Sequence, residues 1–258
     1  MEDNMIQIKK DNQKAKKLFI VIMIVAAVLG GIGGAVASAV GTSGIMDAIH
    51  KAYMGFTIIA PYLAIGILIV STIVTHMMYK QGRNMYAVWI DDDDEGMNLI
   101  EKKLSIALGI SSVVMIIEYF LFPVAFVGLD EMDPYKIFTA TGIGITLLAL
   151  ILTMVYVTIY QRKIIDFLRE MNPEKQGSVY EMKFADKWEA SCDEAEKLIT
   201  YHSAYLAYKT TNYWCMGLWL FCVVGIYSFG FGIMPVAMVS IIWLVMTISY
   251  TRNAIKLS

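Results

Sequence analysis

Long stretches without a charged side chain constrain this chain more than any other feature. Four such stretches cover residues 18–46, 52–79, 137–161 and 210–251. A helix needs about 20 apolar residues to cross the hydrocarbon core of a bilayer, whereas a soluble domain intersperses apolar residues with charges. The composition agrees, since 57% of the 258 residues are hydrophobic and only 17% are charged. The sequence therefore predicts a polytopic membrane protein.

Six segments are long enough to cross. Helix is the expected structure, because the backbone polar groups of a segment in hydrocarbon must pair within that segment. The last two segments come from one uncharged run of 42 residues, in which Gly230, Gly232 and Pro235 predict a helix break. The expected fold class is all-α, a single membrane domain over 1–258 with its helices paired as three hairpins. The predicted spans are approximately 18–40, 55–79, 104–127, 137–160, 212–229 and 233–250.

The distribution of Lys and Arg predicts the orientation of these spans. Of the 21 basic residues, 19 lie in the N-terminal tail, in the second and fourth connections, or in the C-terminal tail. Only Lys51 and Lys136 fall on the other side. Basic residues are enriched in cytoplasmic loops, so both termini are expected in the cytoplasm and the chain in the cell membrane.

The first predicted span has two further features. A lysine-rich start, an apolar run and small residues at 35–39 also resemble a secretory signal, but the apolar run is longer than such signals usually have. We therefore favour an uncleaved span. Ala26, Gly30, Gly34 and Ser38 lie four apart on one helix face. Small residues at this spacing allow close approach of two helices, either within the bundle or across a homodimer interface.

Glu118 is the one formal charge inside a predicted span. Counted from Leu104, it lies roughly 21 Å from the inner face, in the outer third of the hydrocarbon. A carboxyl at this depth is costly unless it is protonated, partnered or facing water, which makes it the default functional candidate. Hydroxyl groups at similar expected depth belong to Tyr62, Thr146 and Tyr227. The alternative is a structural tether between helices, or a side chain that reaches toward the external surface.

The fourth connection, 161–211, is predicted to be a cytoplasmic segment of amphipathic helices. The fourth span continues past the interface until residues 172–177 break the helix. A second helix follows, with an aromatic stripe formed by Tyr180, Phe184 and Trp188. The run Ser191-Cys192-Asp193-Glu194 predicts a capping box, which opens a third helix that continues into the fifth span. The stripe either packs on the protein itself or on lipid, or it forms the binding face for a partner protein.

Several motifs that resemble catalytic or metal sites are incomplete. The sequence Gly-Thr-Ser-Gly at 41–44 resembles the nucleophile motif of intramembrane rhomboid proteases, but no histidine is expected at matching depth on another helix. The acidic run 91–96 matches half of a calcium loop, whereas position twelve is Lys102, so helix capping is the better interpretation. We expect no catalytic, cofactor or metal site. The net charge of −2 also argues against direct nucleic-acid binding.

A family resemblance covers nearly the whole chain. The stretch 172–197 resembles the hallmark region of domain of unknown function 3169, through Asn172-Pro173-Glu174-Lys175, Ser178-Val179-Tyr180, Lys183-Phe184, Lys187-Trp188 and the run from Ser191 to Lys197. This resemblance implies a multi-pass protein of the cytoplasmic membrane of Gram-positive bacteria. It implies no known chemistry, so no site residues are transferred. Members of the family often lie beside small helix-turn-helix regulators, which suits a membrane-bound signalling partner.

Two functions are compatible with these features. The first is a non-enzymatic membrane sensor or accessory subunit, which engages a cytoplasmic regulator or another membrane subunit through the fourth connection. It is favoured because nearly all the non-membrane residues are expected inside the cell. The second is a small transporter or peptide-resistance protein that uses Glu118 in a polar intramembrane path.

Overall fold

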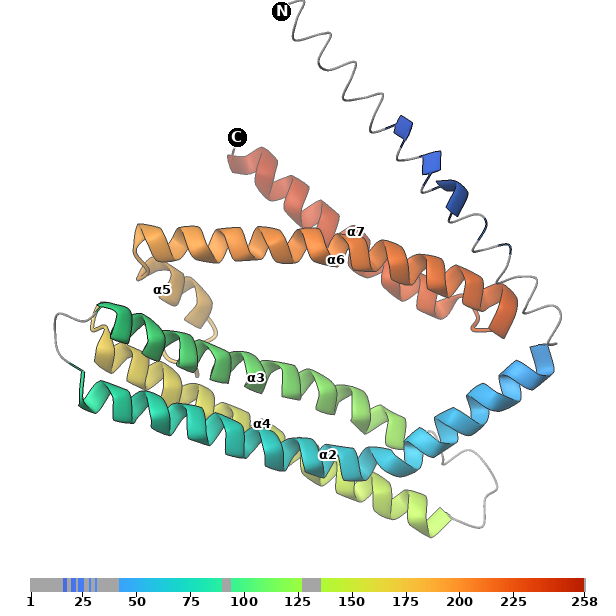
Figure 1. The fold of residues 1–258 in the computed structure, drawn as a ribbon, viewed down its shortest axis with the longest axis horizontal. Coiled ribbons are helices and arrows are strands. Elements are labelled where there is room, and N and C mark those ends of the chain that lie inside the picture. The colour runs from blue at the N-terminus through green and yellow to red at the C-terminus, as the bar shows by residue number, and fades with distance from the viewer. Residues whose placement is uncertain are drawn as a thin grey trace, which may run out of the picture. The chain divides into compact units, whose positions relative to one another are not determined.

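The computed structural model describes residues 42–89, 94–126 and 136–257, together with scattered positions between 16 and 31. Within these ranges the chain forms helices and no strand, so the all-α class is confirmed for the described residues (Figure 1). The helices are α2 (Thr42–Ala87), α3 (Asp94–Phe126), α4 (Lys136–Met171), α5 (Phe184–Ala190), α6 (Glu194–Phe229) and α7 (Met234–Leu257).

Four of the described helices are long and apolar enough to cross a membrane. The qualifying segments are Ile49–Ala87, Glu95–Phe126, Ala140–Met171 and Met234–Lys256. They overlap with the predicted second, third, fourth and sixth spans. The predicted fifth span is helical within α6 but is not among the four, and most of 18–40 lies outside the described residues.

The chain divides into two compact units, one of residues 51–203 and one of residues 1–50 and 204–258. In the first unit, α2, α3 and α4 form a bundle in which α3 runs antiparallel to both neighbours (Figure 1). Eight of the nine buried positions described on α3 follow one another at alternating intervals of four and three residues. They are Ile100, Leu104, Ala107, Ser111, Val114, Glu118, Leu121 and Ala125. This 3.5-residue repeat keeps one seam of side chains facing the partner helices along the whole bundle.

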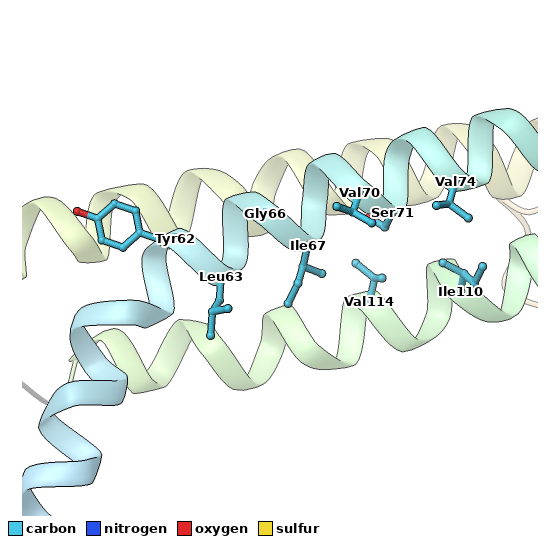
Figure 2. Close-up of a pocket in the computed structure, with 9 residues that line it drawn as sticks. All are labelled: Tyr62, Leu63, Gly66, Ile67, Val70, Ser71, Val74, Ile110 and Val114. Carbon is cyan, nitrogen blue, oxygen red and sulfur yellow. The ribbon is translucent and has the colours of Figure 1, made fainter.

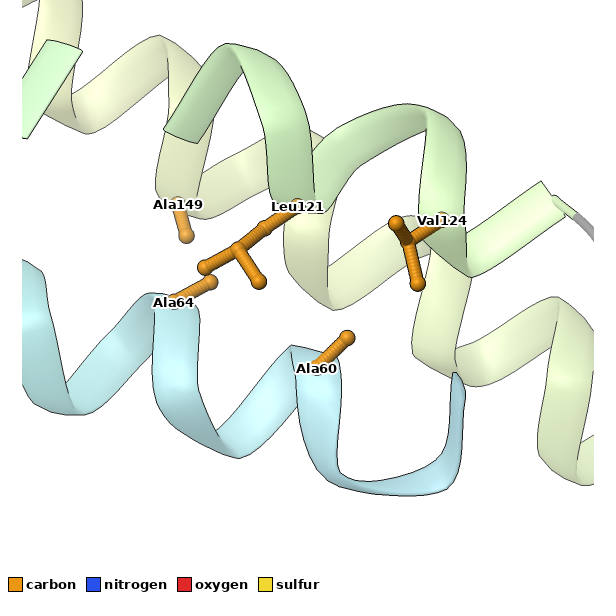
Figure 3. Packing of buried hydrophobic residues seen from close by; sticks show 5 residues of the cluster. All are labelled: Ala60, Ala64, Leu121, Val124 and Ala149. Atoms are coloured by element: carbon orange, nitrogen blue, oxygen red, sulfur yellow. The ribbon is translucent and has the colours of Figure 1, made fainter. Parts of the chain in front are cut away.

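Two hydrophobic clusters fix the register of the three helices. The Leu121 cluster consists of Ala60 and Ala64 from α2, Leu121 and Val124 from α3, and Ala149 from α4 (Figure 3). The Phe167 cluster lies toward the other end of the bundle and consists of Ile100, Leu104, Ala107, Ile164 and Phe167. The small residues of the Leu121 cluster allow close helix packing, which is the usual means of association where lipid removes the hydrophobic driving force.

The connection after α4 departs in two details from the predicted one. The helix break at 172–177 is confirmed, and Gly177 there has φ +110. However, α5 begins only at Phe184, so Tyr180 lies in the preceding turn and does not belong to a helical stripe. The capping box also lies later than predicted. Asp193 Oδ1 accepts from the Glu196 N–H at 2.7 Å, and Glu196 Oε2 accepts from the Asp193 N–H at 3.0 Å.

In the second unit, α6 and α7 run antiparallel from a turn at the predicted break. Gly230 and Gly232 have φ of +65 and +68, a region that glycine adopts without strain. The Phe231 ring between them packs against Gly225. Farther from the turn, Trp243 Nε1 donates to Asn212 Oδ1 at 2.6 Å, and the Tyr208 and Tyr250 rings stack at 4.3 Å.

The contact between α2 and α4 at Gly142 yields a test of this bundle. A Cβ added at Gly142 would lie 3.2 Å from Pro61 Cγ, whereas one added at Gly144 would have nothing within 4 Å. We expect Gly142→Leu to lower the free energy of unfolding by about 1–3 kcal/mol relative to Gly144→Leu, because it forces α2 and α4 apart. Thermal unfolding of the two variants in mild detergent measures the difference. Equal midpoints would contradict the packing of α2 on α4.

Candidate functional site

Glu118 occupies a seam position of α3 and is 1% exposed. Neither carboxyl oxygen has a hydrogen-bond partner among the described residues. Burying a charged carboxylate without a donor costs several kcal/mol, and inside a membrane no bulk water offsets this cost. The charge state of Glu118 is thus coupled to the packing of the first unit.

None of the hydroxyls predicted near Glu118 is shown to bind it. Tyr62 is 62% exposed and lies one residue after Pro61, where α2 changes direction (Figure 2). Thr146 is buried, but its hydroxyl donates to the carbonyl oxygens of Gly142 and Ile143 in its own helix. The Tyr227 side chain lies outside the described residues.

Thr153 is a second buried polar side chain, which the sequence prediction did not include. It is 0% exposed, and its Oγ1 is the third buried side-chain atom without a partner among the described residues. Glu118 precedes Leu121 by three residues, and Thr153 follows Ala149 by four on the antiparallel helix. Both therefore lie roughly 5 Å from the Leu121 cluster in the same direction. The signal was present in the sequence, because Thr146, Thr153 and Tyr160 recur every seven residues on α4.

Polar side chains continue from this layer toward the Phe167 cluster. The Tyr156 hydroxyl lies 3.0 Å from Thr75 Oγ1, and the Tyr160 hydroxyl lies 2.9 Å from His76 Nδ1. The Tyr156 and Tyr160 rings are 5.6 Å apart. We call these groups the polar series; in order from Glu118 it consists of Thr153, Tyr156, Thr75, Tyr160 and His76. Its members belong to α2 and α4, and the series ends at the exposed imidazole of His76.

An apolar groove of about 410 Å³ lies between α2 and α3 beside this layer (Figure 2). Its lining consists of Tyr62, Leu63, Gly66, Ile67, Val70, Ser71, Val74, Ile110 and Val114. The Ser71 hydroxyl donates to the Leu68 carbonyl at 3.1 Å and is not free to bind a guest. The chemistry of the groove therefore suits an acyl chain or another apolar group.

A buried lysine joins the connection after α4 to the start of α6. Lys175 forms an ion pair with Glu196, donates to Cys192 Sγ at 3.4 Å, and lies 5.7 Å from the centre of the Trp188 ring. Burial by itself would lower the Lys175 pKa, but the hydrogen bonds and charge of Glu196 and Cys192 outweigh it and raise the pKa. The ion pair is therefore present at neutral pH, and on the alkaline side it is lost as pH rises through the raised pKa of Lys175.

The predicted partner-binding residues differ in their exposure. Phe184 and Trp188 are half-buried, with ring centres 5.6 Å apart, and the Phe184 ring lies beside Gly177. Both side chains contact residues of their own connection. Tyr180 is 64% exposed, with the Arg162 guanidinium 5.6 Å from its ring centre. Met182, two residues later, is fully exposed.

No three His, Cys, Asp or Glu side chains come together as a metal site within the described ranges. The family model described as a protein of unknown function, DUF3169, matches residues 9–254, nearly the whole chain. No curated protein matches the sequence. No solved structure matches it either.

The Lys175 cluster yields a test that separates a buried ion pair from an exposed one. We expect Lys175→Met to lower the free energy of unfolding by about 2 kcal/mol, because it leaves Glu196 and the connection without their shared cation. Lys187→Met is the matched control, since Lys187 pairs with Glu181 in an exposed setting and should lose no more than about 0.5 kcal/mol. Detergent-solubilised variants compared by thermal unfolding provide the measurement. A loss in Lys175→Met no greater than in the control would disprove the structural role of this lysine.

Proposed function

We propose that this chain, which belongs to the DUF3169 family, is a non-enzymatic, proton-responsive membrane sensor or accessory subunit. In this proposal it crosses the membrane six times as three hairpins, with both termini in the cytoplasm. The four apolar helices and the concentration of 19 of 21 basic residues in alternate connections and tails support this topology.

The single observation that carries the proposal is the burial of Glu118 with both carboxyl oxygens unpartnered among the described residues. The protonated acid is the form that this packing tolerates, because the ionised form would lose its hydration and gain no donor. Loss of the proton must therefore be accompanied by a rearrangement of the bundle. A charge change that biases packing is the basis of a switch.

A movement of the bundle at Glu118 can reach the connection after α4 through few elements of the first unit. Helix α4 contains Thr153 and continues without a break to Met171. The chain then turns, and Lys175 attaches this turn to Glu196 of α6. A displacement of α4 would be passed to the connection that contains the exposed Tyr180 and Met182. We infer that a cytoplasmic regulator or another membrane subunit binds there.

A small transporter or peptide-resistance protein is the second candidate. The apolar groove favours it, because Ile67 lines the groove and also packs on the Leu121 cluster next to Glu118. Uptake or extrusion driven by a pH gradient in proteoliposomes, abolished in Glu118→Gln, would favour this candidate over the sensor.

We expect the stability of the wild-type protein to fall as pH rises above the range in which an exposed glutamate titrates. The folded state would retain the Glu118 proton that the unfolded state has released, so the slope reaches at most about 1.4 kcal/mol per pH unit. Glu118→Gln is neutral at every pH and should lose this part of the slope. Thermal unfolding of both proteins across pH 5–9 measures it, with Glu95→Gln as the exposed control. Identical slopes in wild type and Glu118→Gln would refute the proposal.

The topology has its own test. In a variant without Cys192, Cys215 and Cys222, we expect Met182→Cys to react with a membrane-impermeant maleimide only after the cells are permeabilised. Asp133→Cys, in the connection before α4, should react in intact cells. The opposite pattern would show that the orientation inferred from the basic residues is wrong.

A further inference from the structure

We propose that Glu118 exchanges its proton with water only at the Phe167 end of the bundle, by way of the polar series. The inference rests on the proposed function, in which Glu118 gains and loses a proton. It adds the direction of access and the residues that carry the proton.

The spacing of the polar series matches the α2–α4 interface. Thr153, Tyr156 and Tyr160 follow one another at three and four residues, so they lie on one face of α4 and extend over roughly 10 Å. Thr75 and His76 are consecutive on α2, and each contacts one of the two tyrosines. Hydroxyl groups both donate and accept, which lets each one receive a proton and release another.

His76 is suited to the outer end of this series. Its side chain is exposed, and an imidazole ring has two nitrogens, so one can accept a proton while the other donates one. The charged or titratable groups around this end are Lys163, whose Nζ lies 5.2 Å from the Tyr160 ring centre, and Tyr79, whose ring lies 6.4 Å from that of Tyr160. Nearer to Glu118, the sequence has no charged residue or histidine at 52–75 of α2 or at 137–161 of α4.

The opposite direction offers no comparable path among the described residues. The next layer beyond Glu118 is the Leu121 cluster, which consists of alanine, leucine and valine side chains (Figure 3). Two buried hydroxyls lie near that level, and both donate to carbonyl oxygens of their own helices: Thr57 to Tyr53, and Thr146 to Gly142 and Ile143. A hydroxyl held in this way cannot pass a proton onward without breaking its bond.

The transfer conserves protons at every step. Protonated His76 gives its Nδ1 proton to the Tyr160 hydroxyl oxygen while Tyr160 releases its own proton. Each following hydroxyl gains one proton and loses one, and the last proton arrives on a carboxylate oxygen of Glu118. His76 then takes a new proton from water. Steps between hydroxyls that do not touch use rotation of the hydroxyl or a bridging water.

The experiment follows the infrared band of the protonated carboxyl group after a rapid pH change, with purified full-length protein in lipid nanodiscs. The band that is absent from the spectrum of Glu118→Gln is the one that belongs to Glu118. We expect Tyr156→Phe and His76→Gln to slow the change in this band by roughly tenfold or more, because each removes one proton carrier. The pH midpoint of the band should stay where it is in wild type. The band should also change slowly in Thr153→Val. In Thr153→Ser, which keeps a hydroxyl at this position, it should change as fast as in wild type.

Thr57→Val and Thr146→Val are the controls on the opposite side, and both should leave the rate unchanged. If Tyr156→Phe does not fold, Tyr160→Phe tests the same step. Wild-type rates in the polar-series variants, or slow exchange in Thr146→Val, would overturn the direction of access while leaving Glu118 as the responsive group. If the Glu118→Gln spectrum keeps the band, the proposed function itself fails.

Discussion

The seam of α3 is the constraint on which the first unit depends. Its eight buried positions alternate at four and three residues, so a single line of side chains faces α2 and α4 from one end of the bundle to the other. Glu118 belongs to that line just as Leu121 does. Glu118 is buried because its position belongs to the repeat. A side chain one position earlier or later on α3 would point about 100° away from this line. The same repeat that packs the bundle therefore places an ionisable group where its charge and the packing cannot change independently.

The bundle differs in chemistry along its length. At the Leu121 cluster, alanines bring the helices close and exclude polar groups. At the Phe167 cluster, aromatic rings surround the core, and Arg83 lies 4.7 Å from the Phe167 ring centre while it pairs with Glu170. The polar series fills the length between. One end of the bundle is therefore tight and apolar, while the other offers hydroxyl, imidazole and charged groups.

Hydropathy predicted the helices well, because the absence of charge over some twenty residues depends on the bilayer and not on tertiary packing. It did not predict where the helices end. For example, α2 continues to Ala87, past the last residue of its predicted span, since charged residues outside hydrocarbon remain good helix formers. The neighbours of Glu118 were predicted from depth alone. Depth ignores the direction in which a side chain leaves its helix, and Tyr62 falls two residues from the seam positions Ala60 and Ala64, on nearly the opposite face. Spacing along α4 would have indicated Thr153.

The fourth connection shows a similar limit. An aromatic residue every fourth position predicts a helical stripe, but the sharp turn at Gly177 delays α5 until Phe184 and leaves Tyr180 outside it. The ion pair of Lys175 with Glu196 joins residues on either side of α5, and no local sequence pattern predicts it. Long-range partners of this kind follow from the path of the chain, which the sequence of one segment does not contain.

The turn between α6 and α7 has a consequence for how this chain can vary. Two glycines with positive φ reverse the chain within a few residues, and the pairs Trp243–Asn212 and Tyr208–Tyr250 lie well beyond it on both helices. One residue inserted into the turn would rotate α7 by about 100° about its own axis. Both pairs would then separate at once. Natural selection should therefore keep the number of residues in this turn constant, even where the neighbouring residues are substituted.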